Sequence, residues 1–118
     1  FEYSDVSFYI LHRIAERLLN QPMDQFVKQN FYDPLGADEL LFNPLCTFGQ
    51  ECVAPTERDV FFRRTLIRGT VHDQGAAMMG GVAGHAGLFG TANDLAMLMQ
   101  MNLQKGYYGG RRYYLDNT

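Results

Sequence analysis

The sequence predicts a mainly α-helical domain with a long irregular connection in its centre. Apolar residues recur at helical spacing near both ends of the chain, whereas Pro and Gly interrupt the middle. A length of 118 residues allows one domain, or part of one, but not two independent domains. We therefore expect residues 1–118 to form a single unit.

The composition indicates that this unit is a piece of a larger protein. Charged residues make up 19% of the chain, below the roughly 25% of an average soluble domain. The 9 Phe, 7 Tyr and 6 Met are more than a few short elements readily bury. Some apolar surface is therefore expected to face either another part of a parent chain or an oligomer interface, and composition does not separate the two.

The charge and hydropathy patterns argue against two classes of partner. The chain has 10 Lys and Arg against 13 Asp and Glu, a net charge of -3, and no basic run longer than a pair. A nucleic-acid surface needs a concentrated basic patch, so no nucleic acid is expected as a partner. No apolar run approaches the roughly 18 to 20 residues of a membrane span, so no span is expected.

Two helices are predicted near the N-terminus. The first covers residues 5–19, with Ser4 as its N-cap. Its apolar stripe consists of Val6, Ile10, Leu11, Ile14, Leu18 and Leu19. The second begins at Pro22 and is stopped by Asp33-Pro34-Leu35-Gly36. The two helices are expected to form an antiparallel pair.

The central connection covers residues 37–70 and is expected to contain one short helical turn. A connection of this length is often functional. Residues 65–71 are predicted to be a short strand or an extended segment. Cys46 and Cys52 also lie in this part of the chain. They either form a local disulfide or remain free thiols.

A glycine-rich stretch leads into the last predicted helix. Six of the sixteen residues from 75 to 90 are Gly, which lets backbone or ligand approach closely. The last helix begins at Thr91, which with Asp94 resembles a capping box, and it ends near residues 105–106.

The tripeptide Tyr3-Ser4-Asp5 is the first candidate for chemistry. A Tyr just before a helix can carry a proton if nearby cations lower its pKa from about 10. The structural alternative is that Ser4 caps the helix and Tyr3 packs beside it. Both interpretations stay open on these residues alone.

His85 is the second candidate, because the small residues Gly84 and Ala86 leave it open to a ligand. A His whose ring is satisfied by loop carbonyls is the structural alternative. His72 and Asp73 could form a base with an orienting carboxylate, but adjacent side chains rarely point at each other. We expect these two residues to make structural hydrogen bonds.

The sequence shows neither a nucleophile nor a metal motif. Its two serines, Ser4 and Ser7, lie outside G-x-S-x-G, and no Lys follows either of them by three positions. The cysteines and the two later histidines do not have the usual spacing of zinc ligands. No metal and no cofactor are therefore expected.

The order of three stretches resembles the serine β-lactamase and penicillin-binding-protein-like family, on its class C and esterase side. Tyr3-Ser4-Asp5 and the residues after it are similar to the family's Y-x-N motif and helix. Residues 21–36 are similar to its "QPLDEFV…DPLGM" helix, and residues 80–95 to a "GGVAGHAGLFSTAxDLA" segment. Residues 53–57 and 69–73 fit the same branch, so the match covers nearly the whole chain.

This resemblance implies a helical subdomain of the β-lactamase/transpeptidase-like α/β fold. In that family the nucleophilic Ser of S-x-x-K lies upstream of Y-x-N and a K-T-G-like strand lies downstream, and neither motif is present here. By resemblance Tyr3 would relay the proton of that Ser and Asp5 would take the Asn position. His85 and Gly84 would line the substrate site.

Asp5 departs from the family pattern. An Asn amide can donate to a substrate carbonyl, whereas an ionised Asp can only accept. A carboxylate beside Tyr3 also raises the pKa of the phenol. The resemblance therefore favours an esterase or peptidase-like parent over one that turns over β-lactams.

The sequence thus predicts a fragment of a β-lactamase-like serine hydrolase. The parent would acylate its Ser with a small-molecule ester, amide or β-lactam and release the product by hydrolysis, while this piece alone would be inactive. Its expected partners are the remainder of the parent chain and that substrate. The resemblance implies an exported or periplasmic bacterial protein. The alternatives are a non-catalytic helical binding module with the same fold, and a small metal-binding domain.

Overall fold

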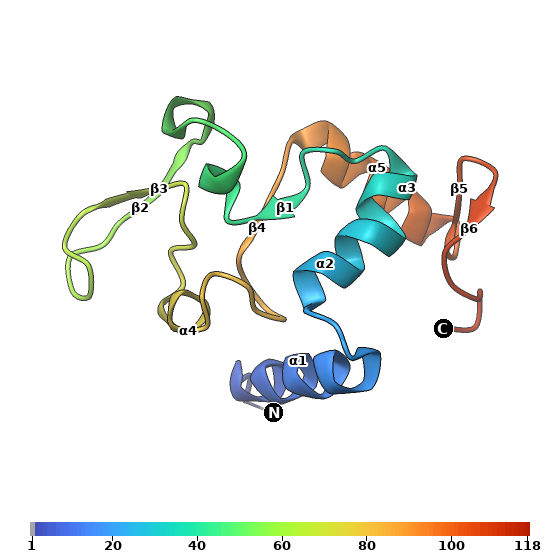
Figure 1. Cartoon of the computed structure of the whole chain (residues 1–118), viewed down its shortest axis with the longest axis horizontal. Coiled ribbons are helices and arrows are strands. Elements are labelled where there is room, and N and C mark those ends of the chain that lie inside the picture. Colours follow the sequence, from blue (N-terminus) through green and yellow to red (C-terminus); the bar gives the residue numbers. More distant parts are fainter. Residues whose placement is uncertain (1) are drawn as a thin grey trace.

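Helices make up the larger share of regular structure in the computed structural model, which describes residues 2–118 (Figure 1). Over these residues 43% are helical and 13% lie in strands. The helices are α1 (Val6–Leu19), α2 (Met23–Val27), a π-helical turn (Lys28–Tyr32), α3 (Asp33–Leu35), α4 (Gln74–Met78) and α5 (Ala92–Leu103), with single 3₁₀ turns at Pro44–Cys46 and Gln50–Cys52. The structure is thus more helical than extended, which supports the predicted mainly α-helical class only in part.

The strands are short and pair as antiparallel two-stranded sheets. They are β1 (Leu41–Phe42), β2 (Pro55–Arg58), β3 (Leu66–Arg68), β4 (Leu88–Phe89), β5 (Tyr107–Tyr108) and β6 (Arg111–Arg112), paired β1 with β4, β2 with β3, and β5 with β6. The extended segment predicted at residues 65–71 contains β3. The central connection is more ordered than predicted, because β2 pairs with β3 as a hairpin that lies at one edge of the molecule (Figure 1).

The second predicted helix is a composite of α2, the π-helical turn and α3. It ends where predicted, because Gly36 adopts the left-handed conformation with a φ of 74° and its N–H bonds to the Asp33 carbonyl. This composite packs against α5 through the main core, whose buried members are Tyr32, Leu35, Ala37, Leu40 and Met101. The hydroxyl of Tyr113 donates to the Pro34 carbonyl at 2.8 Å and ties the C-terminal hairpin to the same core.

One of the two predicted helix N-caps is found in the structure at the predicted residue. Thr91 caps α5, since its Oγ1 accepts from the Asp94 N–H at 3.2 Å. At α1 the N-cap position belongs to Asp5 and not to Ser4, whose Oγ accepts from the Val6 N–H at 3.4 Å. The predicted cap of α5 is thus confirmed, and that of α1 is wrong by one residue.

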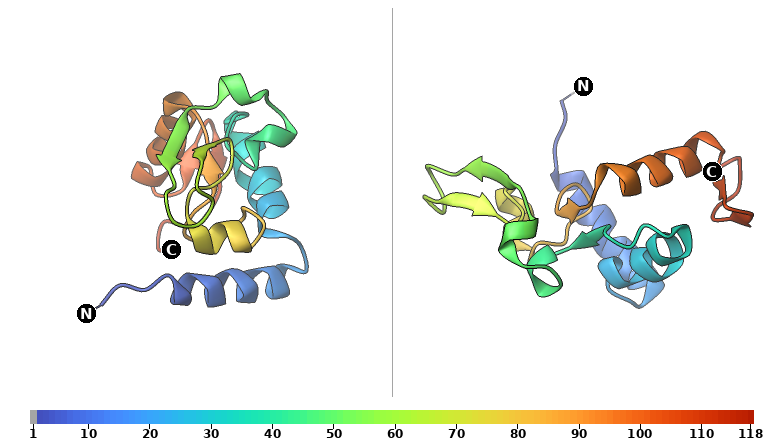
Figure 2. Two further views of the ribbon diagram at one scale, coloured as in Figure 1. Left: turned by 90° about the vertical axis from the view of Figure 1, so that its left-hand side faces the viewer. Right: turned by 90° about the horizontal axis from the view of Figure 1, so that it is seen from above.

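Helix α1 lies along one side of the remaining chain (Figure 2). His12 is the buried residue of this helix, and its Nε2 lies 3.3 Å from Glu16 Oε1. The apolar stripe is exposed, as shown by Val6, Ile10, Leu11, Ile14 and Leu18. Helix α2 rises away from α1 in Figures 1 and 2, so the expected antiparallel pair does not form. The exposure of the stripe shows that α1 does not bury its apolar face against α2.

A second, smaller core lies beneath α4 and the glycine-rich loop. Its buried members are Val71, Ala76 and Ala83. Short side chains here keep the backbone segments close together, and this packing positions the loop that carries His85. Among residues 2–118, none of the helices has both the length and the apolar character to cross a membrane.

Candidate active site

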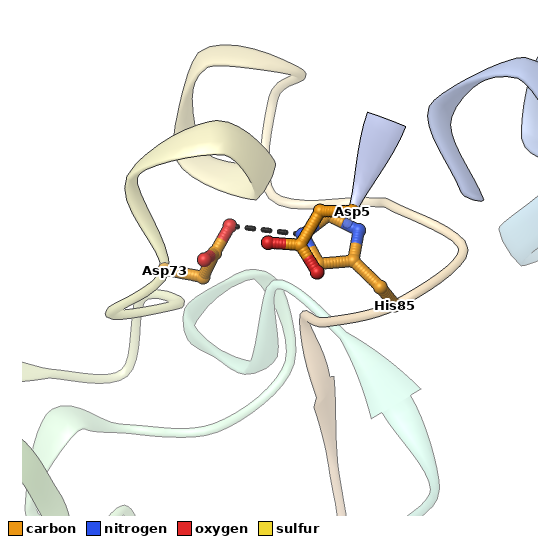
Figure 3. Close-up of side chains that lie close together, drawn as sticks. All are labelled: Asp5, Asp73 and His85. Carbon is orange, nitrogen blue, oxygen red and sulfur yellow. Dashed lines mark hydrogen bonds and ion pairs between the residues drawn. The ribbon is translucent and has the colours of Figure 1, made fainter. Parts of the chain in front are cut away.

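Three side chains from separate segments meet beside the start of α1 (Figure 3). Asp5 directly precedes α1, Asp73 directly precedes α4, and His85 lies in the loop before β4. One oxygen of each carboxylate and one ring nitrogen of His85 all lie within 4.8 Å of one another. The fold therefore gathers two acids and an imidazole at one place.

Asp73 and His85 form the tightest contact of this group. His85 Nε2 donates to Asp73 Oδ1 at 3.1 Å, and the same oxygen accepts from the Ala76 N–H at 2.7 Å as the N-cap of α4. The hydrogen bond from the Ala76 N–H, and to a smaller extent the one from His85, lowers the pKa of Asp73. A carboxylate can only accept, so the proton of a neutral His85 sits on Nε2. The His85 side chain is 6% exposed, and its Nδ1 has no partner among the described residues.

Two glycines let α1 approach this pair. A Cβ on Gly75 would lie 2.1 Å from Tyr9 Oη, and a Cβ on Gly84 would lie 3.1 Å from the Phe8 carbonyl oxygen. The close approach places the Tyr9 ring edge-on to the His85 ring, with centroids 5.0 Å apart. Asp5, at the start of the same helix, is carried to His85 by this docking.

Tyr3 lies at the outer edge of the site. Its side chain is 63% exposed, and its ring centroid is 6.1 Å from that of Phe8. The neighbouring Asp5 carboxylate is the largest cause that raises the pKa of Tyr3 above 10.0. The phenol therefore keeps its proton at neutral pH, so it can donate but does not act as a base unless a cation is added nearby.

The structure brings together the residues that the sequence singled out, with one addition. Asp5 and His85 are neighbours, Asp5 raises the pKa of Tyr3, and Gly84 packs against the α1 backbone. Asp73 was expected to make structural hydrogen bonds, and it does so by capping α4 through the Ala76 N–H; the same carboxylate also accepts from His85. The signal for Asp73 was its place before a short helix, since an Asp at that position caps the helix with its carboxylate fixed.

The same three side chains form the one group of His, Cys, Asp and Glu residues in residues 2–118 whose donors could share a cation. The group includes neither Cys46 nor Cys52, which are free and exposed. Asp73 Oδ1 already accepts two hydrogen bonds, one of them from His85 Nε2. Hydrogen bonding therefore accounts for the arrangement of Asp73 and His85 without a cation.

Comparison with known proteins identifies the family. The family model described as Beta-lactamase matches residues 1–114. Two bacterial proteins, each named "Putative D-alanyl-D-alanine carboxypeptidase", are similar: one from Escherichia coli (strain K12) is 43% identical and one from Salmonella schwarzengrund (strain CVM19633) is 41% identical, both over 128 residues. The alignments cover 98% of this chain and 30% of each relative, so the chain spans less than a third of their length. No solved structure matches the chain significantly. The chain belongs to the beta-lactamase family, within the serine β-lactamase and penicillin-binding-protein superfamily that its motifs resemble.

Proposed function

We propose that this chain is the helical part of a bacterial serine hydrolase, and that Tyr3, Asp5 and the Asp73–His85 pair form one wall of its active site. The observation that carries the proposal is the meeting of Asp5 with His85 and Asp73, in a chain of this family. The carboxylates of Asp5 and Asp73 both raise the pKa of Tyr3, which supports placing Tyr3 beside the group. These residues offer both a proton donor and fixed acceptors at one surface.

The remainder of the parent chain is the partner we assign to the outer face of α1. Val6, Ile10 and Ile14 lie on that face and are about half exposed, which is uncommon for a row of large apolar residues. The relatives extend well beyond the 30% of their length that aligns with this chain. Burial of these side chains against the rest of the hydrolase would complete the core that residues 2–118 leave open.

The proposed reaction is acyl transfer to a Ser that the remainder of the protein supplies. The Ser Oγ attacks the substrate carbonyl carbon, and the bond to the leaving nitrogen or oxygen breaks. Tyr3 donates its hydroxyl proton to the leaving group and takes the Ser proton in the same step, so the phenol is protonated both before and after it. Water then cleaves the acyl–enzyme ester, which releases the acid and restores the Ser. The names of the relatives favour a peptide that ends in D-Ala-D-Ala as the natural substrate.

Asp5 makes an ester or peptide a better substrate than a β-lactam. Its carboxylate offers only acceptors where the family's Asn offers an amide donor to the substrate carbonyl. It also keeps Tyr3 protonated, which suits the donation of a proton to a leaving alcohol or amine. Asp73 orients the His85 ring, and Gly84 allows that ring to sit against α1.

Assays of the full-length protein beside the 118-residue chain test this proposal. The substrates are a chromogenic β-lactam, a p-nitrophenyl ester and a D-Ala-D-Ala peptide. We expect hydrolysis by the full-length protein alone, reduced by Asp73→Asn and unchanged by the exposed control Asp116→Asn.

Two outcomes would contradict the proposal. One is hydrolysis by the isolated chain that disappears with Ser4→Ala or Ser7→Ala, because the nucleophile would then lie here. The other is a full-length protein that binds these compounds without cleaving them, which would favour the non-catalytic binding module.

A further inference from the structure

Arg63 links the β2–β3 hairpin to the residues just before Asp73. Its Nη1 donates to the Val71 carbonyl at 2.7 Å and its Nη2 to the His72 carbonyl. Its Nε donates to Asp59 Oδ2 at 3.3 Å. One guanidinium thus joins a carboxylate in the hairpin to two successive carbonyls that lead into the candidate site.

Asp59 holds this guanidinium from a fixed position. Its side chain is 4% exposed, and its carboxylate accepts from the N–H groups of Phe61, Phe62 and Arg63 at 2.8 to 2.9 Å. These backbone donors lower the pKa of Asp59 to about 2, so the carboxylate stays ionised near neutral pH. Arg63 is therefore anchored at one end by a buried charge.

The other end of the link controls the backbone that presents Asp73. A guanidinium is planar and its N–H groups form a rigid fork, so two bonds to neighbouring carbonyls fix the orientation of both peptide groups. Asp73 follows directly, and its carboxylate must face both Ala76 N and His85 Nε2. A rotation of the preceding peptides would move it away from His85.

We propose that Asp59 and Arg63 form a positioning unit that holds Asp73 against His85. Neither residue belongs to the group of donors at the site, so both act through the backbone of Val71 and His72. The neighbouring Arg64 is exposed and makes no hydrogen bond or ion pair among the described residues, although it carries the same charge. It provides a matched control. The effect on catalysis rests on the proposed function, but the effect on His85 does not.

The test is the hydrogen bond that His85 Nε2 donates to Asp73, followed by NMR of the ring Nε2 proton in the full-length protein. In Arg63→Gln we expect this proton to exchange with solvent faster, toward its rate in Asp73→Ala, because the carboxylate leaves Nε2. Loss of the Arg charge alone would leave the hydrogen bond in place, so a change in the exchange rate separates the two causes.

Further variants protect the test against a general loss of folding. Arg63→Lys keeps the charge but loses the fork, and should speed the exchange of the His85 Nε2 proton in a protein that remains folded by circular dichroism. Arg64→Gln should leave the exchange rate unchanged. The proposal is overturned if Asp73→Ala speeds this exchange while both Arg63 variants leave it at the wild-type rate. A catalytically silent full-length protein would contradict the proposed function and leave this NMR outcome decisive for the positioning unit.

Discussion

His85 Nε2 lies 3.1 Å from Asp73 Oδ1, although the two residues are 12 positions apart in the sequence. The chain between them makes the short helix α4 and then turns back through Gly80 and Gly81, whose φ angles of 82° and 87° favour glycine. The N-cap Asp at the start of the loop therefore meets the His at its end. The glycine-rich segment thus positions the Asp73 carboxylate and the His85 ring for this hydrogen bond.

The contact between Gly75 and Tyr9 predicts a steric effect at the site. Gly75→Ala would place a Cβ 2.1 Å from Tyr9 Oη, and we expect a loss of about 1–3 kcal/mol in the free energy of unfolding. This loss should appear even though Ala favours a helix over Gly by up to about 1 kcal/mol. Urea unfolding of the full-length protein measures the change, with exposed Gln74→Ala as the control. Addition of Tyr9→Phe removes the clashing oxygen and should recover part of the loss; no recovery would contradict this explanation.

The pairing of Asp5 with Tyr3 predicts the effect of restoring the family's Asn. Asp5→Asn removes the carboxylate that raises the pKa of Tyr3, so the phenol should titrate closer to 10.0. The new amide can donate to a substrate carbonyl, and one such bond corresponds to about a tenfold gain in β-lactam acylation. NMR titration of Tyr3 and stopped-flow acylation by a chromogenic β-lactam measure the two effects. An unchanged pKa together with slower acylation would count against the role given to Asp5.

The full burial of Leu40 predicts that the main core makes a large contribution to the free energy of unfolding. The side chain is fully buried between the α2–α3 segment and α5, and a Cβ on Gly90 would lie 2.5 Å from its Cδ2. Leu40→Ala should reduce the free energy of unfolding by about 2–5 kcal/mol, because the cavity cannot close fully. The exposed Leu103→Ala should change it by less than about 0.5 kcal/mol. Equal losses for the two variants would show that this core is not the one that forms.

Asp59 predicts an acid-dependent part of the stability. Its pKa falls from 3.8 in the unfolded chain to about 2 in the fold, so its ionised form stabilises the fold at pH values above 3.8. This stabilisation is lost as the pH falls from 3.8 toward about 2. The difference in unfolding free energy between the wild type and Asp59→Asn should be constant from about pH 7 to about pH 5 and should shrink below that range. A difference that stays the same down to about pH 2 would rule out this role.

Local sequence signals predicted the elements whose structure is decided by neighbouring residues. The bounds of α1 follow from its helical period, the end of α3 from Gly36, and the start of α5 from Thr91. The β2–β3 hairpin was missed because β2 is exposed along its whole length and shows no alternation of apolar and polar residues. The orientation of α1 could not be predicted either, since its apolar stripe is exposed and does not pack against the other described residues.

The sequence named three residues of the candidate site but not the contacts between them. Tyr3 was singled out by its place before a helix, His85 by its small neighbours and Asp5 by the motif resemblance, while the partner of His85 depends on the path of the loop through α4. Adjacent side chains rarely point at each other, so His72 was not expected to pair with Asp73, and in the structure His72 offers its carbonyl to Arg63. Such contacts are set by the three-dimensional path of the backbone, which short motifs do not encode.

The central claim is that Tyr3 carries the proton in acyl transfer. Tyr3→Phe in the full-length protein removes one hydroxyl at the site, and Tyr107→Phe removes one from an exposed Tyr in β5. Hydrolysis of a p-nitrophenyl ester and a D-Ala-D-Ala peptide should fall by about 10²- to 10⁴-fold in the first variant and stay at the wild-type rate in the second. Wild-type rates in Tyr3→Phe would contradict the claim and remove Tyr3 from the mechanism.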